Sequence, residues 1–163
     1  MSIEQDVSLK PYTTFGIDVA ARYFASFASL ITLAELLASE YYVPSKTMVL
    51  GGGSNVLFTK DYDGLVLKNE MGGVDLIAED AGHVLVKAGA GVNWHQFVLY
   101  CLEHNYAGVE NLSLIPGNVG ASPMQNIGAY GVEIKDVFHE LEAFHLQDKI
   151  LKTFTLEECR FGY

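Results

Sequence analysis

Apolar residues recur at helical spacing in two parts of the chain. In residues 29–41 the leucines fall on one face of a helix, and Thr32 and Glu35 have the spacing of a capping box. Residues 93–102 show the pattern more clearly, with apolar side chains along one face and a capping residue, Asn93, in front of them. We therefore expect two amphipathic helices, each with one face in the core.

Alternation with a period of two predicts the strands, and turn residues separate them. The expected order is a strand at 47–50, an extended run at 56–58, a turn at 61–64, strands at 65–68 and 83–88, and a hairpin of 137–146 with 150–154 around 147–149. A capping box of Thr155 and Glu158 opens a short helix after this hairpin.

Two helices between unequal groups of strands predict an α+β fold in two lobes. The break at residues 69–73 contains two adjacent glycines and is the expected boundary, with lobe one at about 1–69 and lobe two at about 70–163. Residues 161–163 follow directly on the start of a helix rather than on a polar tail. We therefore expect a domain that is truncated at its C-terminal end.

Composition narrows the classes of protein. Among 163 residues, 50% are hydrophobic and only 18% are charged, which excludes a disordered chain. The net charge of −10 argues against nucleic acid as a partner, because phosphate backbones require clustered cations. The uncharged stretch 111–132 contains too many glycines and prolines for a membrane helix, and the N-terminus has no secretory signal. We expect a cytoplasmic protein without a membrane partner.

Two glycine-rich segments carry the candidate chemistry. The loop Gly51–Asn55 lies between extended segments, so its N–H groups can face an anion without Cβ atoms in the way, although a plain hairpin turn has the same pattern. The segment Ile115–Gly131 is neutral and apolar, which suits a flat aromatic ligand with Ile115, Met124 and Ile127 as its apolar wall. A buried connector is the alternative for this segment.

Together, the order and spacing of these segments resemble the UDP-N-acetylenolpyruvoylglucosamine reductase (MurB) family. The motifs that carry the resemblance are LKPYTTFGI at 9–17, LGGGSNVLF at 50–58, AGAGVNWH at 88–95, ENLSLIPGNVGASPMQNIGAYGVE at 110–133 and ECRFGY at 158–163. Asn118 and Ala121 depart from the residues common in this family, which puts in doubt only a hydroxyl contact at Ala121.

The resemblance implies a two-lobed FAD-binding domain of the vanillyl-alcohol-oxidase (PCMH) type. It implies that loop 51–55 holds the pyrophosphate and that segment 115–131 runs beside the ribityl chain and the isoalloxazine ring. The cofactor-binding residues implied are Gly51, Gly52, Gly53, Ser54, Asn55, Val56, Leu57, Ile115, Pro116, Gly117, Gly120, Ala121, Gln125, Asn126, Ile127, Gly128 and Tyr130.

The reaction implied is NADPH-dependent reduction of UDP-N-acetylglucosamine enolpyruvate to UDP-N-acetylmuramate, a step of peptidoglycan synthesis. The Arg, Ser and Glu that the family uses are expected beyond Tyr163, in a substrate-binding domain that residues 1–163 do not include, so no catalytic residue is assigned. The fragment alone is then expected to be inactive. A stand-alone flavin- or nucleotide-binding module and a different oxidase with this fold remain as alternatives.

The other reactive side chains receive structural interpretations. Arg160 is expected at a helix end or in an ion pair, and His95 on a helix surface. Cys101 and Cys159 are expected to be buried apolar residues, because neither belongs to a metal or redox pattern. The remaining histidines have no ligand spacing, so we expect no metal site.

Overall fold

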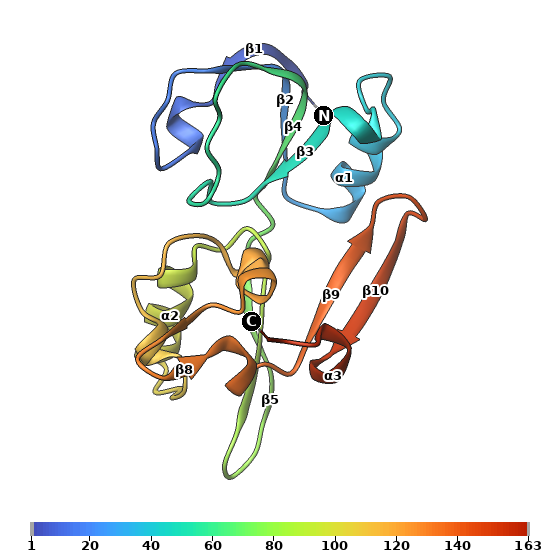
Figure 1. Ribbon diagram of the computed structural model, residues 1–163. Helices are drawn as coiled ribbons and strands as arrows, with labels where there is room; N and C mark the ends of the chain where they lie inside the picture. Colours follow the sequence, from blue (N-terminus) through green and yellow to red (C-terminus); the bar gives the residue numbers. More distant parts are fainter. Residues whose placement is uncertain (1, 163) are drawn as a thin grey trace. The chain divides into compact units, whose positions relative to one another are not determined.

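The computed structural model describes residues 2–162, which form two compact units with the boundary between Gly72 and Gly73 (Figure 1). Unit one is the part up to Gly72, and unit two begins at Gly73. Each combines strands and helices, so the expected α+β class is confirmed.

Unit one is built on a four-stranded sheet in the order β1-β2-β4-β3. Strand β1 (Glu4–Ser8) pairs antiparallel with β2 (Ala20–Phe27), whereas β2, β4 (Tyr62–Asn69) and β3 (Thr47–Leu50) run parallel. The carboxyl ends of these three strands therefore share one edge of the sheet. Loop 51–55 leaves the sheet at this edge, directly after β3.

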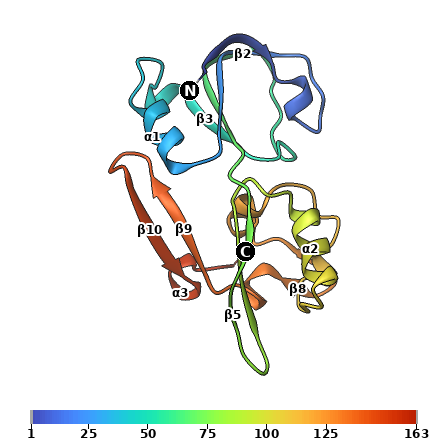
Figure 2. The ribbon, with the colours of Figure 1, turned by 180° about the vertical axis from the view of Figure 1, so that it is seen from behind.

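Apolar side chains cover both faces of this sheet. In β4, Leu65, Val66 and Leu67 are all buried, as expected of a central parallel strand. Helix α1 (Leu30–Leu37) packs on one side of the sheet (Figures 1 and 2). Three of its leucines, Leu33, Leu36 and Leu37, are buried. A core cluster of unit one consists of Leu9, Val19, Ala21, Phe24, Leu50, Phe58 and Val66.

Helix α1 starts where the sequence predicts but ends four residues early. Its cap is Ser29, whose hydroxyl accepts the Thr32 N–H at 3.1 Å, so the expected Thr32–Glu35 capping box is wrong. The Ser39 hydroxyl donates to the Leu36 carbonyl at 2.7 Å and occupies a group that a further helical turn would use. The helix therefore stops at Leu37 instead of Tyr41.

Two other expectations for unit one are wrong, and two of its strands were not anticipated. Strands β1 and β2 were not anticipated, and residues 56–58 form no strand. The expected turn at 61–64 falls largely inside β4, because Gly64 serves close backbone packing: a Cβ there would lie 2.1 Å from the Lys46 carbonyl oxygen. Strand β3 matches the expected 47–50.

An exposed ion cluster joins β4 to its neighbours. Asp63 accepts Arg22 Nη1 at 2.8 Å and Lys46 Nζ at 2.9 Å. The hydrogen bond from Arg22, followed by that from Lys46, lowers the pKa of Asp63 to about 2. The cluster thus links β2, the turn before β3, and β4.

The 51–55 loop is fastened to the 12–14 segment through Gly53. The Thr14 N–H donates to the Gly53 carbonyl at 3.1 Å, and a Cβ on Gly53 would lie 1.9 Å from the Tyr12 carbonyl oxygen. Gly53 is at a φ of +66°, which glycine adopts without strain. This glycine is required by packing within the protein.

Unit two begins with a hairpin and a helix. Strand β5 (Val74–Glu79), which was not anticipated, pairs with β6 (Val84–Ala88), and α2 (Trp94–Glu103) follows. Asn93 caps this helix as expected, accepting the Gln96 N–H at 3.1 Å. The core contains Trp94, Val98, Cys101, Val109, Leu112, Ile127 and Ile134.

The rest of unit two consists of short elements and a second hairpin. A two-residue pair, β7 (Gly128–Ala129) and β8 (Val132–Glu133), precedes the antiparallel hairpin of β9 (Glu140–His145) and β10 (Ile150–Thr155). The expected first strand of this hairpin began three residues too early. The Thr155–Glu158 capping box is confirmed and opens α3 (Leu156–Cys159).

Replacing Gly53 by Ala tests the packing of the loop on Tyr12. The collision with the Tyr12 carbonyl oxygen and the positive φ act together, so we expect the free energy of unfolding of unit one to fall by at least about 2 kcal/mol. Urea unfolding followed by far-UV circular dichroism measures the change. Trp94 fluorescence reports unit two in the same experiment, because it is the single tryptophan.

Gly16→Ala is the matched control. Gly16 has a similar φ of +61°, but a Cβ there meets no atom within 4 Å. In Gly16→Ala only the backbone strain of the positive φ remains, so we expect the free energy of unfolding to fall by about 1 kcal/mol. Equal losses for the two variants would contradict the importance of the contact with Tyr12.

The Asp63 cluster makes stability depend on pH. A carboxyl whose pKa is lowered on folding stabilises the protein above its unfolded pKa, and this contribution is lost as pH falls through the folded value of about 2. We expect Asp63→Asn to be less stable than wild type at pH 6, with the difference shrinking between pH 4 and pH 2. Urea midpoints at both ends of this range measure it, and a difference independent of pH would refute the cluster's role.

Candidate functional site

The residues expected to bind a cofactor fall into both units. Loop 51–57 belongs to unit one and segment 115–131 to unit two, so each part is described separately.

The loop after β3 presents backbone donors that the protein does not use. Within residues 2–162, the N–H groups of residues 52–55 donate to no backbone or side-chain acceptor. Four successive free N–H groups at the carboxyl edge of parallel strands can form an anion-binding concavity. This geometry fits a phosphate group.

The glycines of this loop differ in what surrounds them. Gly53 is held against Tyr12, whereas a Cβ on Gly51 would meet no atom within 4 Å. Open space at Gly51 lets a ligand approach the backbone, so this glycine, rather than Gly53, has the freedom that the cofactor interpretation requires. Val56 packs against the core of unit one, and Leu57 is exposed.

A cation lies beside the loop and was missed by the sequence analysis. Lys68 on β4 pairs in register with Leu50, and its ammonium group donates to the Gly51 carbonyl. Burial lowers the pKa of Lys68, and the nearby Glu70 partly opposes this effect. The signal in the sequence was a lysine directly after the apolar run Leu65–Leu67.

The segment 115–131 has an irregular backbone with several left-handed residues. Asn126 and Tyr130 have positive φ although neither is glycine, as do Gly117 and Gly131, and Leu114 directly before the segment has positive φ too. Such conformations cost about 1–3 kcal/mol each at non-glycine residues and gather at functional sites. Tyr130 and Gly131 form the tight turn between β7 and β8, where two positive φ values are typical.

The start of α2 fixes the first half of this segment. The Trp94 N–H donates to the Gly117 carbonyl at 3.0 Å, and the Asn118 side-chain amide donates to the Gly91 carbonyl at 3.0 Å. The buried Trp94 indole donates to the Leu112 carbonyl at 2.7 Å. A Cβ on Gly120 would lie 2.6 Å from Ala90 Cβ, so Gly120 is required for this packing.

The second half of the segment separates buried from accessible side chains. Ile127 is in the core, and the buried Asn126 donates to Glu133 Oε2 at 2.9 Å. Met124 and Tyr130 are 89% and 90% exposed. Of the expected apolar wall, Met124 is therefore open to a ligand and Ile127 mainly supports the backbone, with Ile115 between them in exposure.

A polar hollow lies beside the β7–β8 turn. Its volume is about 400 Å³, and its walls include Gly128, Glu133, Lys135 and Asp136. Glu133 pairs with Lys135, and this contact, followed by the Asn126 hydrogen bond, lowers the pKa of Glu133. One face of the candidate segment thus borders charged groups.

His95 is more engaged than a helix-surface residue, so that expectation is wrong in part. It is half-buried, its Nδ1 lies 3.2 Å from Ser113 Oγ, and the Leu114 N–H donates to the same nitrogen at 3.4 Å. Because Nδ1 accepts this N–H, the neutral ring carries its proton on Nε2. The ring holds the entry to segment 115–131.

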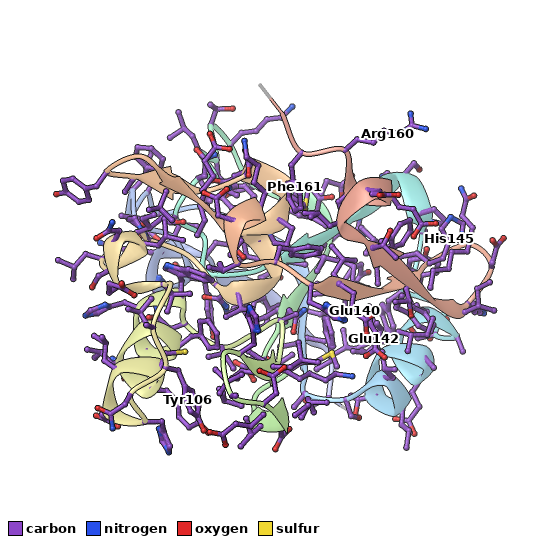
Figure 3. All side chains as sticks on the ribbon, turned by 90° about the horizontal axis from the view of Figure 1, so that it is seen from below. Tyr106, Glu140, Glu142, His145, Arg160 and Phe161 are labelled. Carbon is purple, nitrogen blue, oxygen red and sulfur yellow. The ribbon has the colours of Figure 1, made fainter. Side chains whose placement is uncertain are left out.

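The other reactive residues take structural positions. Figure 3 shows the Arg160 side chain extending outward. The backbone N–H of Arg160 donates to the Glu157 carbonyl at the end of α3, which confirms the expected helix-end position. Phe161 packs against Phe138. Cys101 is buried as expected, but Cys159 is only half-buried, and both are free thiols.

Metal sites and membrane-spanning helices each require a particular arrangement of residues. No group of three or more His, Cys, Asp or Glu side chains is arranged to hold a metal ion there. No helix in this part of the chain is long and apolar enough to cross a membrane.

Known proteins resemble this chain along its whole length. UDP-N-acetylenolpyruvoylglucosamine reductase of Amoebophilus asiaticus (strain 5a2) is 47% identical over 163 residues, which are 100% of this chain and 48% of that protein. The reductase of the same name from Pseudomonas fluorescens (strain Pf0-1) is 51% identical over 165 residues, again 100% and 48%. The chain thus spans about half the length of the curated relatives it matches.

A solved structure and a family profile agree with these relatives. The crystal structure of UDP-N-acetylenolpyruvylglucosamine reductase (MurB) from Thermus caldophilus superposes with a TM-score of 0.75 at 27% identity, covering 100% of this chain and 56% of that one. The profile of the FAD binding domain family matches residues 32–153. This chain therefore belongs to the FAD binding domain family.

Proposed function

We propose that this chain is the FAD-holding part of a UDP-N-acetylenolpyruvoylglucosamine reductase that acts in the cytoplasm. The observation that carries the proposal is the row of free N–H groups at residues 52–55, in a loop that lies within the family match. The similarity to reductases along all of residues 1–163 supports the choice of reaction.

In this proposal the two segments hold different parts of the cofactor. The N–H groups of residues 52–55 bind the pyrophosphate, and the hydroxyl of Ser54 and the amide of Asn55 add donors. Segment 115–131 lies along the ribityl chain and the ring, with N–H groups at Ile115 and Gly117 that find no acceptor within residues 2–162. The Trp94 and Asn118 hydrogen bonds hold this backbone in place before the cofactor binds, which lowers the entropy lost on binding.

The proposed reaction needs groups beyond those that hold the cofactor. Bound FAD would accept a hydride from NADPH and supply it to the enolpyruvyl double bond of the UDP-sugar. Reduction also requires a proton donor for the neighbouring carbon and a cation for the substrate carboxylate. We assign both to the part of the protein that residues 1–163 do not cover, and we give this chain the binding and orientation of the flavin.

Gly51→Val tests the loop assignment. The added side chain enters open space, so the fold should be unaffected, but it blocks approach to the loop backbone. We expect FAD affinity to fall at least tenfold while the far-UV circular dichroism spectrum stays native. Titration of the purified chain with FAD, followed by flavin fluorescence and absorption, gives both dissociation constants.

Gly82→Val is the control for this substitution. Gly82 lies in the turn between β5 and β6, and its nearest contact for a Cβ is Asp80 Oδ1 at 3.9 Å. FAD affinity should stay within about twofold of wild type. An unchanged affinity in Gly51→Val would mean that loop 51–55 is only a turn.

Residues 1–163 alone should give no NADPH oxidation that depends on the enolpyruvyl sugar nucleotide. A positioned proton donor typically contributes 10²–10⁴-fold to rate, and none is assigned within this chain. The assay follows NADPH absorbance with saturating FAD, with and without the sugar nucleotide. Turnover that requires the sugar nucleotide would overturn this division of roles.

A further inference from the structure

Lys68 occupies a position on β4 where the sheet favours an apolar side chain. Val66, two residues earlier on the same face, belongs to the core cluster of unit one. In the parallel register Lys68 lies opposite Leu50, which is buried in that cluster. The lysine stem therefore extends over the end of an apolar core, and its ammonium group reaches the carboxyl edge of the sheet.

The ammonium group is only partly used by the protein. An ammonium group has three N–H donors, and the one hydrogen bond of Lys68 Nζ within residues 2–162 is to the Gly51 carbonyl, with Glu70 interacting only through its charge. Lys68 forms no ion pair with a carboxylate of these residues. Two donors of the ammonium group therefore remain available at the first residue of the glycine loop.

Folding alone does not account for this charge. Burial lowers the pKa of Lys68, which means that the position disfavours the charged form. A methionine or leucine would fill the same space without that desolvation. Residues that break a local rule without a compensating partner are typical of functional sites.

We propose that the Lys68 ammonium group binds the pyrophosphate of FAD, supplying the charge that the N–H groups of residues 52–55 lack. The inference rests on the proposed function of the chain. Pyrophosphate carries two negative charges to a protein of net charge −10, so a cation at the binding loop offsets unfavourable long-range repulsion. Arg22 and Lys46 do not serve this purpose, because both pair with Asp63 near the start of β4.

The test measures the affinities of wild type, Lys68→Met, Lys68→Arg and Lys60→Met for FAD and for riboflavin, which has no phosphate, together with their urea stabilities. Lys68→Met keeps the apolar stem and removes the charge. Lys60→Met removes an exposed charge of the same unit as a control. Each titration is repeated at low and high salt, since screening weakens charge-dependent binding.

We expect Lys68→Met to bind FAD at least tenfold more weakly, with a smaller salt dependence, to bind riboflavin as wild type does, and to be at least as stable in urea. Lys68→Arg should retain most of the FAD affinity, because arginine also binds phosphate. Lys60→Met should match wild type.

Two results would overturn the assignment. FAD affinity that is unchanged in Lys68→Met excludes a contact with the pyrophosphate. Equal losses for FAD and riboflavin, together with lower stability in urea, would make Lys68 a purely structural support of Gly51. A wild-type chain that binds no FAD refutes the proposed function itself, and the inference about Lys68 with it.

Discussion

The parallel pairing of β3 with β4 is the constraint on which the candidate loop depends. Along a paired strand, backbone N–H and C=O groups are satisfied by the neighbouring strand. This pairing ends at Leu50 opposite Lys68, and the chain then leaves the sheet through three glycines. The N–H groups of residues 52–55 no longer face the acceptors of the sheet and find no others within residues 2–162. The loop that we propose for anion binding thus begins where the sheet ends, and the same register places a lysine beside it.

In unit two, the candidate segment 115–131 is ordered in a different way. Segment 115–131 contains only short elements, two single-turn 3₁₀ helices (Val119–Ala121 and Pro123–Gln125) and the two-residue strand β7, so contacts from outside help to fix its backbone. The start of α2 supplies them through the N–H groups and side chains around Trp94, and the core beneath holds Ile127 and Ile134. A well-packed helix terminus therefore supports a backbone whose left-handed residues would otherwise be unfavourable. The exposed Met124 and Tyr130 are what this support leaves accessible.

The sequence predicted what local signals determine. The caps of α2 and α3, strand β3 and the second hairpin follow from short patterns of capping residues and alternation. Strands β1 and β2 were not predicted, because the segments that pair, from Glu4 with Phe24 onward, show no clear alternation of apolar and polar residues. The candidate segments were found from their glycine and apolar patterns, and the family resemblance assigned them to FAD, whereas the role proposed for Lys68 required the register of β4. Which glycines are required by packing likewise depends on contacts between residues that are distant in sequence.

The glycines of these motifs are therefore of two kinds, those required by packing and one that borders open space. Gly53, Gly64 and Gly120 are each held by a backbone or methyl group that a Cβ would strike, so steric packing within the protein explains them without any ligand. A Cβ on Gly51 would meet no atom within 4 Å, so the packing of residues 2–162 does not explain this glycine. The two kinds are coupled, because the tight contact of Gly53 with Tyr12 fixes the path of the loop that Gly51 begins. A packed glycine thus gives the open one its precise position, which is why a glycine-rich loop can be rigid enough to preorganise backbone donors for an anion.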